Sequence, residues 1–483
     1  MVALKQKEDR GSNRLRKVEN PGFKKFMTEG WDKKTNTPLD VAPHSQFAQF
    51  RQQYLSDQFP KDRLIIEAGD YKVRNNDCNY RFRPYSAFTY YTCMGMDYEP
   101  GAVLVFEPIK IEVKEEKKWS HVVTLYVPEP KGRTTSEFYE DPIHGEFWIG
   151  ARPELANFQE QTGISTKPLS ELKNDLKKYL PVGGKTRYLR EEDSDQKLEE
   201  VASEQRLIKD AWEVEQMRLA IKATKVGFDR VISKLNDTID KPRGERIVEG
   251  NFNAAAIEYG NCVGYETIAA SGDHATTLHW IRNNGVVKSG DLLLLDAGVE
   301  VDSLYTADVT RTLPINGEFT FWQRQVYTAV LEAANAGFKK AVPGNKFKDV
   351  HDAAMEVLAE KLKEMGILKV SVEEALSEKG MQYRRWMCHG TSHHLGIDVH
   401  DCAAARASMY MEGELKPGMI FTIEPGLYFK SDDLFVPKDY RGIGVRIEDD
   451  ILITEDGAEY LTKDFPRNPE HVESWVKTLR NQA

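Results

Sequence analysis

Short apolar runs of strand length alternate with stretches of helical spacing in the first half of the chain. Residues 47–55 (FAQFRQQYL) have the pattern of an amphipathic helix start, and 62–69 (DRLIIEAG) form an apolar strand closed by glycine. Aromatic and β-branched residues dominate 87–93 (AFTYYTC), 101–108 (GAVLVFEP) and 117–130 (KKWSHVVTLYVPEP), so we predict a strand in each. This alternation predicts an α/β domain in the first half of the chain.

The second half opens with a longer helical pattern. Apolar residues recur at helical spacing throughout 208–235, which predicts one long helix. Two more helices are predicted at 324–342 and 350–366. Predicted strands occupy 265–271, 291–298, 419–426 and 444–454. These elements indicate a second domain that also mixes helices and strands.

Between the halves, residues 189–205 (LREEDSDQKLEEVASEQ) are acidic and poor in apolar residues, as is typical of an exposed linker or helix surface. We place the boundary there and predict an N-terminal domain over 45–200 and a second domain over 206–483. Residues 1–44 are polar, lack sustained periodicity and are predicted to form a tail. The basic stretch 5–17 within it is interpreted as a solvated terminus.

The composition excludes several classes of protein. With 40% hydrophobic and 29% charged residues the chain is typical of a globular protein, and its net charge of −10 argues against nucleic acid as a partner. We see no apolar run that could span a membrane and no secretory signal in MVALKQKEDRGSNRLRK. The five cysteines form no CxxC pair and are expected to be free thiols in the cytoplasm.

Two aspartates follow apolar runs near the middle of the chain. Asp296 ends LLLLD, and Asp308 follows in YTADVTRT. A lone aspartate after a strand is usually a turn former, but a strand, a tight connection at Gly298 and a returning strand would point both carboxylates into one cavity. Because side chains alternate along a strand, Thr310 and Thr312 share the face of Asp308 and can support a ligating carboxylate.

Four histidines lie within HGTSHHLGIDVH, a density that is unusual for structural histidines alone. His389 and His393 share a face whether the segment is a strand or a helix, since both spacings align them. His400 ends the stretch, and glycines within it permit close approach of the backbone.

Two glutamates complete the set of candidate ligands. Glu424 follows the apolar run MIFTI, where a carboxylate is costly to bury unless it is paired or bound to metal. Arg446 and Glu448 share a strand face in GVRIEDD, so the arginine could hold a carboxylate or bind substrate. We interpret Asp449 and Asp450 as solvated charges at a strand end.

One imidazole and four carboxylates on apolar strands suit a pair of divalent cations better than one. Two metals about 3.5–4 Å apart lower the pKa of a shared water towards neutrality, so the pattern predicts a hydrolase. The set is rich in hard oxygen ligands and favours Mn²⁺, although Co²⁺ or Zn²⁺ would also bind. No GxSxG motif supports a nucleophilic serine.

The order Asp, Asp, His, Glu, Glu in the contexts DAG, YxxDxTRT, HGxxHxLGxDVHD, EPGLY and VRIED resembles the pita-bread metallopeptidases, and within them aminopeptidase P. The segment RLIIEAGDYKVRNNDCNYRFRPYSAFTYYT resembles the creatinase-like domain that precedes the catalytic domain in aminopeptidase P and prolidase. The resemblance runs from about residue 45 onward. It implies an α/β (α+β) chain with a creatinase-like N-terminal domain and a pita-bread catalytic domain.

The resemblance also implies the functional residues. The metal ligands would be Asp296, Asp308, His393, Glu424 and Glu448. The residues acting on substrate would be Glu424 as proton shuttle, with His279, His389, His400 and Arg446. The implied cofactor is a pair of divalent metal ions, with Mn²⁺ the first expectation.

Two positions depart from the family pattern. Thr89 stands where some relatives place a tryptophan that reaches a neighbouring subunit, which puts completion of the site by a neighbour in doubt. Asp302 and Ser303 lie in a connection one residue longer than in the shortest relatives, and we expect the turn to absorb the difference.

The implied activity is removal of the N-terminal residue from peptides with proline at position two, by a hydroxide attacking the carbonyl before proline. An alternative is a prolidase, which shares the metal site but cleaves Xaa-Pro dipeptides. A remote alternative is a metal-free pita-bread scaffold that only binds partners. The resemblance further implies a homo-oligomer, a dimer or a tetramer, with no nucleic-acid or membrane partner.

Overall fold

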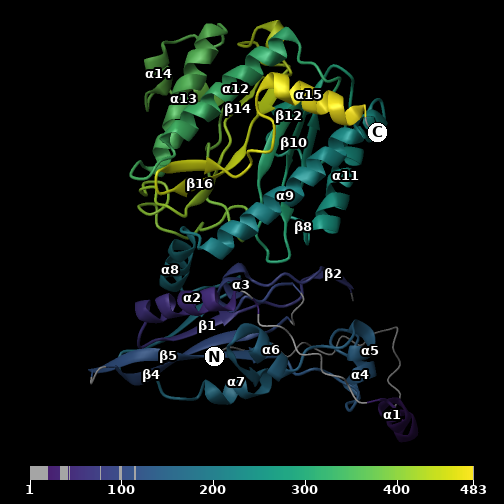
Figure 1. Cartoon of the computed structure of the whole chain (residues 1–483), viewed down its shortest axis with the longest axis vertical. Helices are drawn as coiled ribbons and strands as arrows, with labels where there is room; N and C mark the ends of the chain where they lie inside the picture. Colours follow the sequence, from purple (N-terminus) through teal and green to yellow (C-terminus); the bar gives the residue numbers. More distant parts are fainter. Residues whose placement is uncertain are drawn as a thin grey trace. The chain divides into compact units, whose positions relative to one another are not determined.

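The computed structural model describes residues 20–32, 42, 44–76, 78–96, 100–113 and 116–481. The chain divides into two compact units, Met1–Leu198 and Glu199–Ala483, which are described one at a time (Figure 1). The division falls within the acidic segment 189–205, and there the chain forms helix α8 (Gln196–Arg206).

The first unit is built on a five-stranded sheet with the order β6-β5-β4-β1-β7. Its strands are β1 (Arg63–Glu67), β4 (Val103–Val113), β5 (Glu116–Val127), β6 (Ser165–Pro168) and β7 (Thr186–Leu189). Strand β4 pairs antiparallel with β1 and β5, whereas β1–β7 and β5–β6 are parallel pairs. The remaining elements are β2 (Val73–Asn75), β3 (Cys78–Asn79), α2 (Ser45–Gln58), α4 (Glu137–Glu140), α5 (Glu146–Ile149), α6 (Leu155–Thr162) and α7 (Leu169–Asp175).

The strand predicted at 87–93 is wrong, because this segment forms helix α3 (Ser86–Thr92), all of whose residues are buried. Tertiary partners override the local preference for a strand. Arg51 and Gln52 of α2 donate to the carbonyls of Tyr90 and Tyr91, at 3.0 and 2.7 Å, and so satisfy acceptors at the helix end.

The predicted tail is also partly wrong, because Pro21–Thr28 form helix α1. The Asn20 side chain accepts hydrogen bonds from the backbone of Gly22 and Phe23, and proline occupies the first turn, which needs no donor there. The basic stretch 5–17 lies outside the described residues.

The second unit contains two three-stranded antiparallel sheets, β12-β10-β9 and β13-β16-β17, and two shorter pairs, β14-β15 and β11-β8. Its strands are β8 (Cys262–Val263), β9 (Ile268–Ser271), β10 (Leu292–Ala297), β11 (Val299–Glu300), β12 (Val309–Pro314), β13 (Ile420–Ile423), β14 (Gly426–Tyr428), β15 (Gly444–Arg446), β16 (Asp449–Thr454) and β17 (Gly457–Tyr460). The strands predicted at 265–271, 291–298, 419–426 and 444–454 are confirmed, the last as two strands with Glu448 between them.

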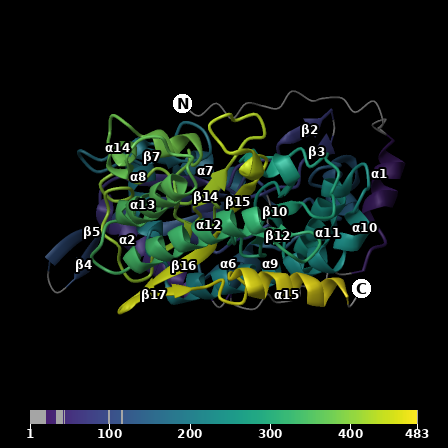
Figure 2. The ribbon, with the colours of Figure 1, turned by 90° about the horizontal axis from the view of Figure 1, so that it is seen from above.

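Helices cover these sheets on their outer sides. They are α9 (Ala211–Ser233), α10 (Leu235–Thr238), α11 (Gly244–Tyr259), α12 (Phe321–Lys340), α13 (Phe347–Glu364), α14 (Val372–Leu376) and α15 (Pro469–Arg480). The pair α9–α11 packs on β9 and β11, and α12 of the pair α12–α13 packs on β13, β14 and β15 (Figures 1 and 2). The sheets therefore lie between two helix pairs, and their inward side chains face one another.

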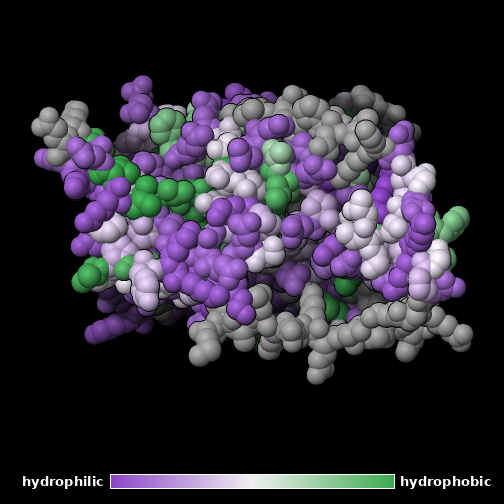
Figure 3. Space-filling view, turned by 90° about the horizontal axis from the view of Figure 1, so that it is seen from below, coloured by the Kyte–Doolittle hydropathy of each residue, from purple (hydrophilic) through white to green (hydrophobic). Residues whose placement is uncertain are grey.

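The face of the molecule in Figure 3 is mostly hydrophilic, with hydrophobic side chains in separate groups. Among the described residues, no helix combines the length and the apolar character that crossing a bilayer requires.

A buried ionic network joins β12 to the start of β16. The fully buried Arg311 donates to the carbonyl of Glu448 and to Asp449 Oδ1, both at 2.6 Å. Thr462 donates to the same Asp449 oxygen, and Arg467 Nε lies 2.7 Å from the other. The interpretation of Asp449 and Asp450 as solvated is wrong, because they are 1% and 0% exposed. Burial alone would raise the pKa of Asp449, but Arg311 and Arg467 hold it below its usual value.

Replacing Asp449 by alanine should lower the free energy of unfolding by about 3–5 kcal/mol, because the buried Arg311 and the half-buried Arg467 lose their counter-charge. Denaturant unfolding of the second unit at pH 7 measures this loss. The control is Glu470→Ala, which removes an exposed partner of Arg324 and should cost less than about 1 kcal/mol. Equal losses in the two variants would contradict a structural role for the Asp449 network.

Candidate metal centre and active site

The two predicted aspartates meet on neighbouring strands. Asp296 lies in β10 opposite Thr310 of β12, and Asp308 lies immediately before β12. The hydroxyl of Tyr265 contacts both carboxylates, at 2.7 Å from Asp296 Oδ1 and closer still to Asp308 Oδ1. Arg446 Nη2 donates to the other oxygen of Asp296 at 2.5 Å. The side chains of β10 and β12 thus converge as the spacing predicted.

His393 reaches the same place from the segment that runs beside β13. Its backbone NH donates to the Thr422 hydroxyl, and its carbonyl accepts from the Thr422 NH at 2.9 Å. The ring Nδ1 lies 3.2 Å from the carbonyl of His394, which can only accept, so Nδ1 carries a proton and Nε2 is the nitrogen that can bind a cation once its own proton has left. Nε2 lies 3.3 Å from Asp308 and 3.5 Å from Glu424.

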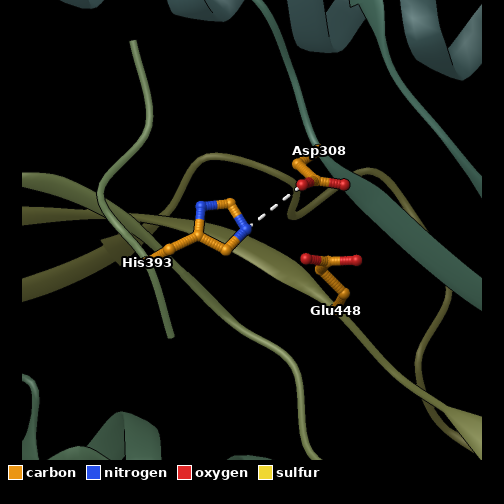
Figure 4. Close-up of side chains that lie close together, drawn as sticks. All are labelled: Asp308, His393 and Glu448. Carbon is orange, nitrogen blue, oxygen red and sulfur yellow. Dashed lines mark ion pairs between the residues drawn. The ribbon is translucent and has the colours of Figure 1, made fainter. Parts of the chain in front are cut away.

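Asp308, His393 and Glu448 offer ligand atoms that all lie within 4.8 Å of one another (Figure 4). The figure shows the His393 ring directed at the two carboxylates, with its ion pair to Asp308 drawn. Thr310 donates to Glu448 Oε2 at 2.6 Å, which fixes that carboxylate. The predicted sharing of a face by Asp308 and Thr310 is therefore part of how the site is held.

The site concentrates negative charge away from water. Burial raises the pKa of Asp296 and Glu448, and nearby carboxylates add to the effect. Asp450, whose Oδ2 accepts from the backbone of Asp308 at 3.3 Å, has a pKa raised for the same reasons. Arg446 contacts Asp296 and His393 contacts Asp308, and two cations cannot neutralise a cluster of five carboxylates. The donor set, mainly carboxylate oxygens with one imidazole, fits hard divalent cations.

The pKa values of Glu424 and His393 are both raised in the metal-free protein. Burial raises the pKa of Glu424 to about 7. The positive charges of His393 and Arg446 lower this pKa, and the negative charge of Asp308 raises it further. Burial lowers the pKa of His393, but the hydrogen bond to Asp308 and the charge of Glu424 outweigh it and raise the pKa to about 9. A carboxyl group that titrates near neutrality is suited to proton transfer.

The three predicted substrate histidines lie around this cluster. His389 Nδ1 lies 2.7 Å from the Gly390 carbonyl and 3.6 Å from Glu424 Oε2, and Nε2 lies 2.8 Å from the Tyr428 hydroxyl. Burial, aided by Arg446, lowers the pKa of His389 to about 3, so its ring is neutral. The ring centroids of His400 and His393 lie 4.4 Å apart. His279 is exposed, and its charge contributes to the lowered pKa of His389 and His400, after burial.

Three residues of the site were not predicted from the sequence. Tyr265 links the two aspartates, Tyr428 links Arg446 to His389, and Asp450 lies against Asp308. Tyr428 lies on β14 opposite Gly444 of β15, two residues from Arg446, and this pairing brings it to the site. No local pattern separates these residues from core aromatics or from surface charge.

The longer connection between the aspartates is absorbed by a turn at 302–303, as expected. Leu304 adopts a left-handed backbone conformation with φ of 70° there, and Ser303 donates to Gln216 at 2.8 Å.

Comparison with known proteins agrees with this geometry. The model of metallopeptidase family M24 matches residues 215–455, and that of the aminopeptidase P N-terminal domain matches residues 47–188. The chain belongs to metallopeptidase family M24. The predicted order of an aminopeptidase P-type N-terminal domain and a pita-bread catalytic domain is confirmed.

Relatives match over nearly the whole chain. Xaa-Pro aminopeptidase 1 of Streptomyces coelicolor is 44% identical over 471 residues, 94% of this chain and 91% of the relative. The Xaa-Pro aminopeptidase of Escherichia coli is 31% identical over 468 residues, 90% of this chain and 98% of the relative. A solved structure of E. coli aminopeptidase P with the inhibitor Pro-Leu superposes with a TM-score of 0.75 at 29% identity, covering 92% of this chain and 100% of that chain.

Metal binding to the M24 site should strengthen as pH rises. Glu424, with a pKa of about 7, and His393, with a pKa of about 9, both carry protons at pH 6, and these must leave before the groups can bind a cation. We expect the affinity for Mn²⁺ to rise from pH 6 to pH 9, by up to about tenfold per pH unit for each proton displaced. Calorimetric titration in buffers of different ionisation enthalpy counts the protons. Glu424→Gln should release about one proton fewer, and an affinity independent of pH would contradict the assignment.

Proposed function

We propose that this protein is a dinuclear Xaa-Pro aminopeptidase that removes the N-terminal residue from peptides with proline at position two. The observation that carries the proposal is the buried carboxylate and histidine cluster in a chain whose N-terminal domain is of the aminopeptidase P type. The relatives that match both units carry the same name. The superposed E. coli enzyme binds Pro-Leu, which has the form of the product left after such a cleavage.

We further propose that Asp296, Asp308, His393, Glu424 and Glu448 hold two divalent cations, Mn²⁺ being preferred for this oxygen-rich set. Bound cations would supply a water of lowered pKa and polarise the carbonyl before proline. The contacts of Tyr265 with Asp296 and Asp308, and of Thr310 with Glu448, orient the ligand carboxylates. A metal-free binding scaffold is disfavoured, because it would have no use for five ligand-type residues of which three are buried and two are half-buried.

In this mechanism, Glu424 moves a proton from the attacking water to the nitrogen of the departing proline. Burial raises its pKa in the metal-free protein, so the surroundings of Glu424 favour the protonated carboxyl group that such a transfer needs. His389, kept neutral by burial, is held by Tyr428, which in turn accepts from Arg446 at 3.0 Å. His279, His389 and His400 would bind the substrate carbonyl and the negative charge that develops on it.

The second candidate is a prolidase, which would share every group named above. A prolidase requires a positively charged group that binds the free carboxylate of a dipeptide. An aminopeptidase site must instead leave room for the peptide chain that continues beyond the proline. The similarity to Xaa-Pro aminopeptidases across both units favours the longer substrates.

We also propose a cytoplasmic homo-oligomer, a dimer or a tetramer. No disulfide joins the cysteines in the described part of the chain, which suits a reducing compartment. Thr89 is buried within its own unit and gives no support to completion of the site by a neighbour.

The metal-stripped protein reloaded with Mn²⁺ should release free arginine from an Arg-Pro-Pro peptide and should cleave Ala-Pro and Gly-Pro poorly. The physical reason is that a site open beyond proline loses nothing when the chain continues. Amino-acid release, compared between stripped and reloaded protein, measures both the specificity and the metal requirement. Rapid cleavage of the dipeptides with the longer peptide left intact would make the protein a prolidase.

Replacing His400 by alanine should lower kcat by about two to four powers of ten while both metals stay bound, because its proposed partner is the substrate. The matched variant is Glu448→Ala, which should lose at least one metal by elemental analysis. Metal loss in the His400 variant would instead make this histidine a ligand. Full metal content and full activity in the Glu448 variant would remove Glu448 from the ligand set.

A further inference from the structure

The loop that carries His279 is closed by one buried carboxylate. It leaves β9 at Ser271, passes through the short 3-10 helix Gly272–Thr276 and returns at Gly285. Glu245, in the first turn of α11, is fully buried and accepts from the backbone NH of Ser271 at 2.8 Å and of Gly285 at 2.6 Å. One side chain thereby binds both ends of the loop.

The same carboxylate also binds two side chains inside the loop. His274 Nδ1 lies 2.8 Å from Glu245 Oε1, and Trp280 donates its Nε1 to Oε2 at 2.9 Å. The two rings stack with centroids 3.9 Å apart. Each Glu245 oxygen thus contacts two nitrogens, one from the backbone and one from a ring. A buried carboxylate is stable only when it is paired or hydrogen-bonded in this way.

The packing leaves the loop little freedom at this point. A Cβ added at Gly285 would lie 2.6–2.7 Å from His274 and Glu245 atoms, so no other residue fits there without displacing them. Two residues before Gly285, Asn283 is fully buried. Its side chain donates a hydrogen bond to the carbonyl of Thr267 at 2.8 Å and accepts one from the NH of Ala269 at 2.9 Å. The backbone hydrogen bonds described for residues 274–281, which include His279, join near neighbours. One example is the bond from the Ile281 NH to the His279 carbonyl.

We propose that Glu245 is a positioning residue, which holds loop 272–284 in the one arrangement that presents His279 to the substrate. His279 directly precedes Trp280, so the bond between Trp280 and Glu245 fixes the backbone beside it. The loop also touches the segment after β14, where Lys430 donates to Thr277 at 3.1 Å and Ser431 to Asp273 at 3.0 Å. This inference rests on the proposed role of His279 in the reaction.

A double-mutant cycle separates positioning from general stability. Glu245→Gln keeps the shape but turns an NH₂ group towards a backbone NH, so the loop loses at least one of the hydrogen bonds that hold its ends. In the Mn²⁺-loaded enzyme acting on Arg-Pro-Pro, this change should lower kcat by about tenfold to a hundredfold with full metal content. In a His279→Ala background, the same change should alter kcat by less than about twofold. An equal fold-change in both backgrounds would overturn the proposal.

Two further variants keep the test decisive. Trp280→Phe removes a single donor and is the variant to use in the cycle if Glu245→Gln fails to fold. Asp62→Asn is the matched control, since Asp62 is a buried carboxylate of the first unit that accepts from Lys185 NH and Arg187 at 2.9 and 2.6 Å. It should lower stability without lowering kcat of the folded enzyme. A loss of kcat in this control equal to that of Glu245→Gln would overturn the positioning role.

The outcome is distinguishable from failure of the proposed function. If the wild type cleaves dipeptides instead, the cycle is run on Ala-Pro and decides the role of Glu245 for that activity. Hydrogen exchange adds a readout that needs no turnover: amides of 272–284 should exchange at least about tenfold faster in Glu245→Gln than in Asp62→Asn. Unchanged exchange in the loop would overturn the proposal. A wild type without any hydrolysis would overturn the proposed function and the catalytic part of this inference together.

Discussion

The catalytic unit depends on the cost of holding several carboxylates together away from water. Asp296, Asp308, Glu448 and Asp450 are each less than a tenth exposed, and Glu424 titrates near neutrality beside them. Such a cluster is unstable unless protons or cations neutralise it. Protons stabilise the cluster in the metal-free protein, and a cation bound there would have to displace them, so proton binding and cation binding at this site obey one electrostatic constraint.

Both neutral hydroxyl groups and a cationic side chain stabilise the carboxylate cluster. Tyr265 and Thr310 supply hydroxyl donors to the carboxylates, and Arg446 donates to Asp296 and to Tyr428. A rigid frame lies behind them. Arg311 joins β12 to the backbone of Glu448, and Arg206 and Lys209 lie 3.0 and 3.7 Å from the buried Asp401, next to His400. Burial alone would raise the pKa of Asp401, but these two cations hold it below its usual value.

Under the proposed assignment, the candidate metal ligands and the candidate substrate residue His279 lie on different kinds of element. The ligand-type residues sit on or beside sheet strands, which are fixed by pairing. His279 instead lies on a loop and is exposed, so its position depends on buried anchors such as Glu245 and Asn283. Strand pairing fixes the positions of side chains on a sheet. A histidine on an exposed loop lacks this pairing, so its position requires additional anchoring residues.

The sequence by itself determined the main features of the site. The candidate ligands stand at the ends of apolar runs or at alternate positions in DVTRT and VRIE, so the local sequence was enough to identify them. The strands around them formed as predicted, because hydrophobic periodicity determines the secondary structure there. Only the tertiary structure decided the rest. Ser86–Thr92 became a helix whose end is satisfied by Arg51 and Gln52. Asp449 and Asp450 became buried because they contact Arg311 and Asp308, which are distant in the sequence. The links of Asp296 to Arg446 and of Thr310 to Glu448 join residues more than a hundred positions apart, and no local pattern specifies such pairs.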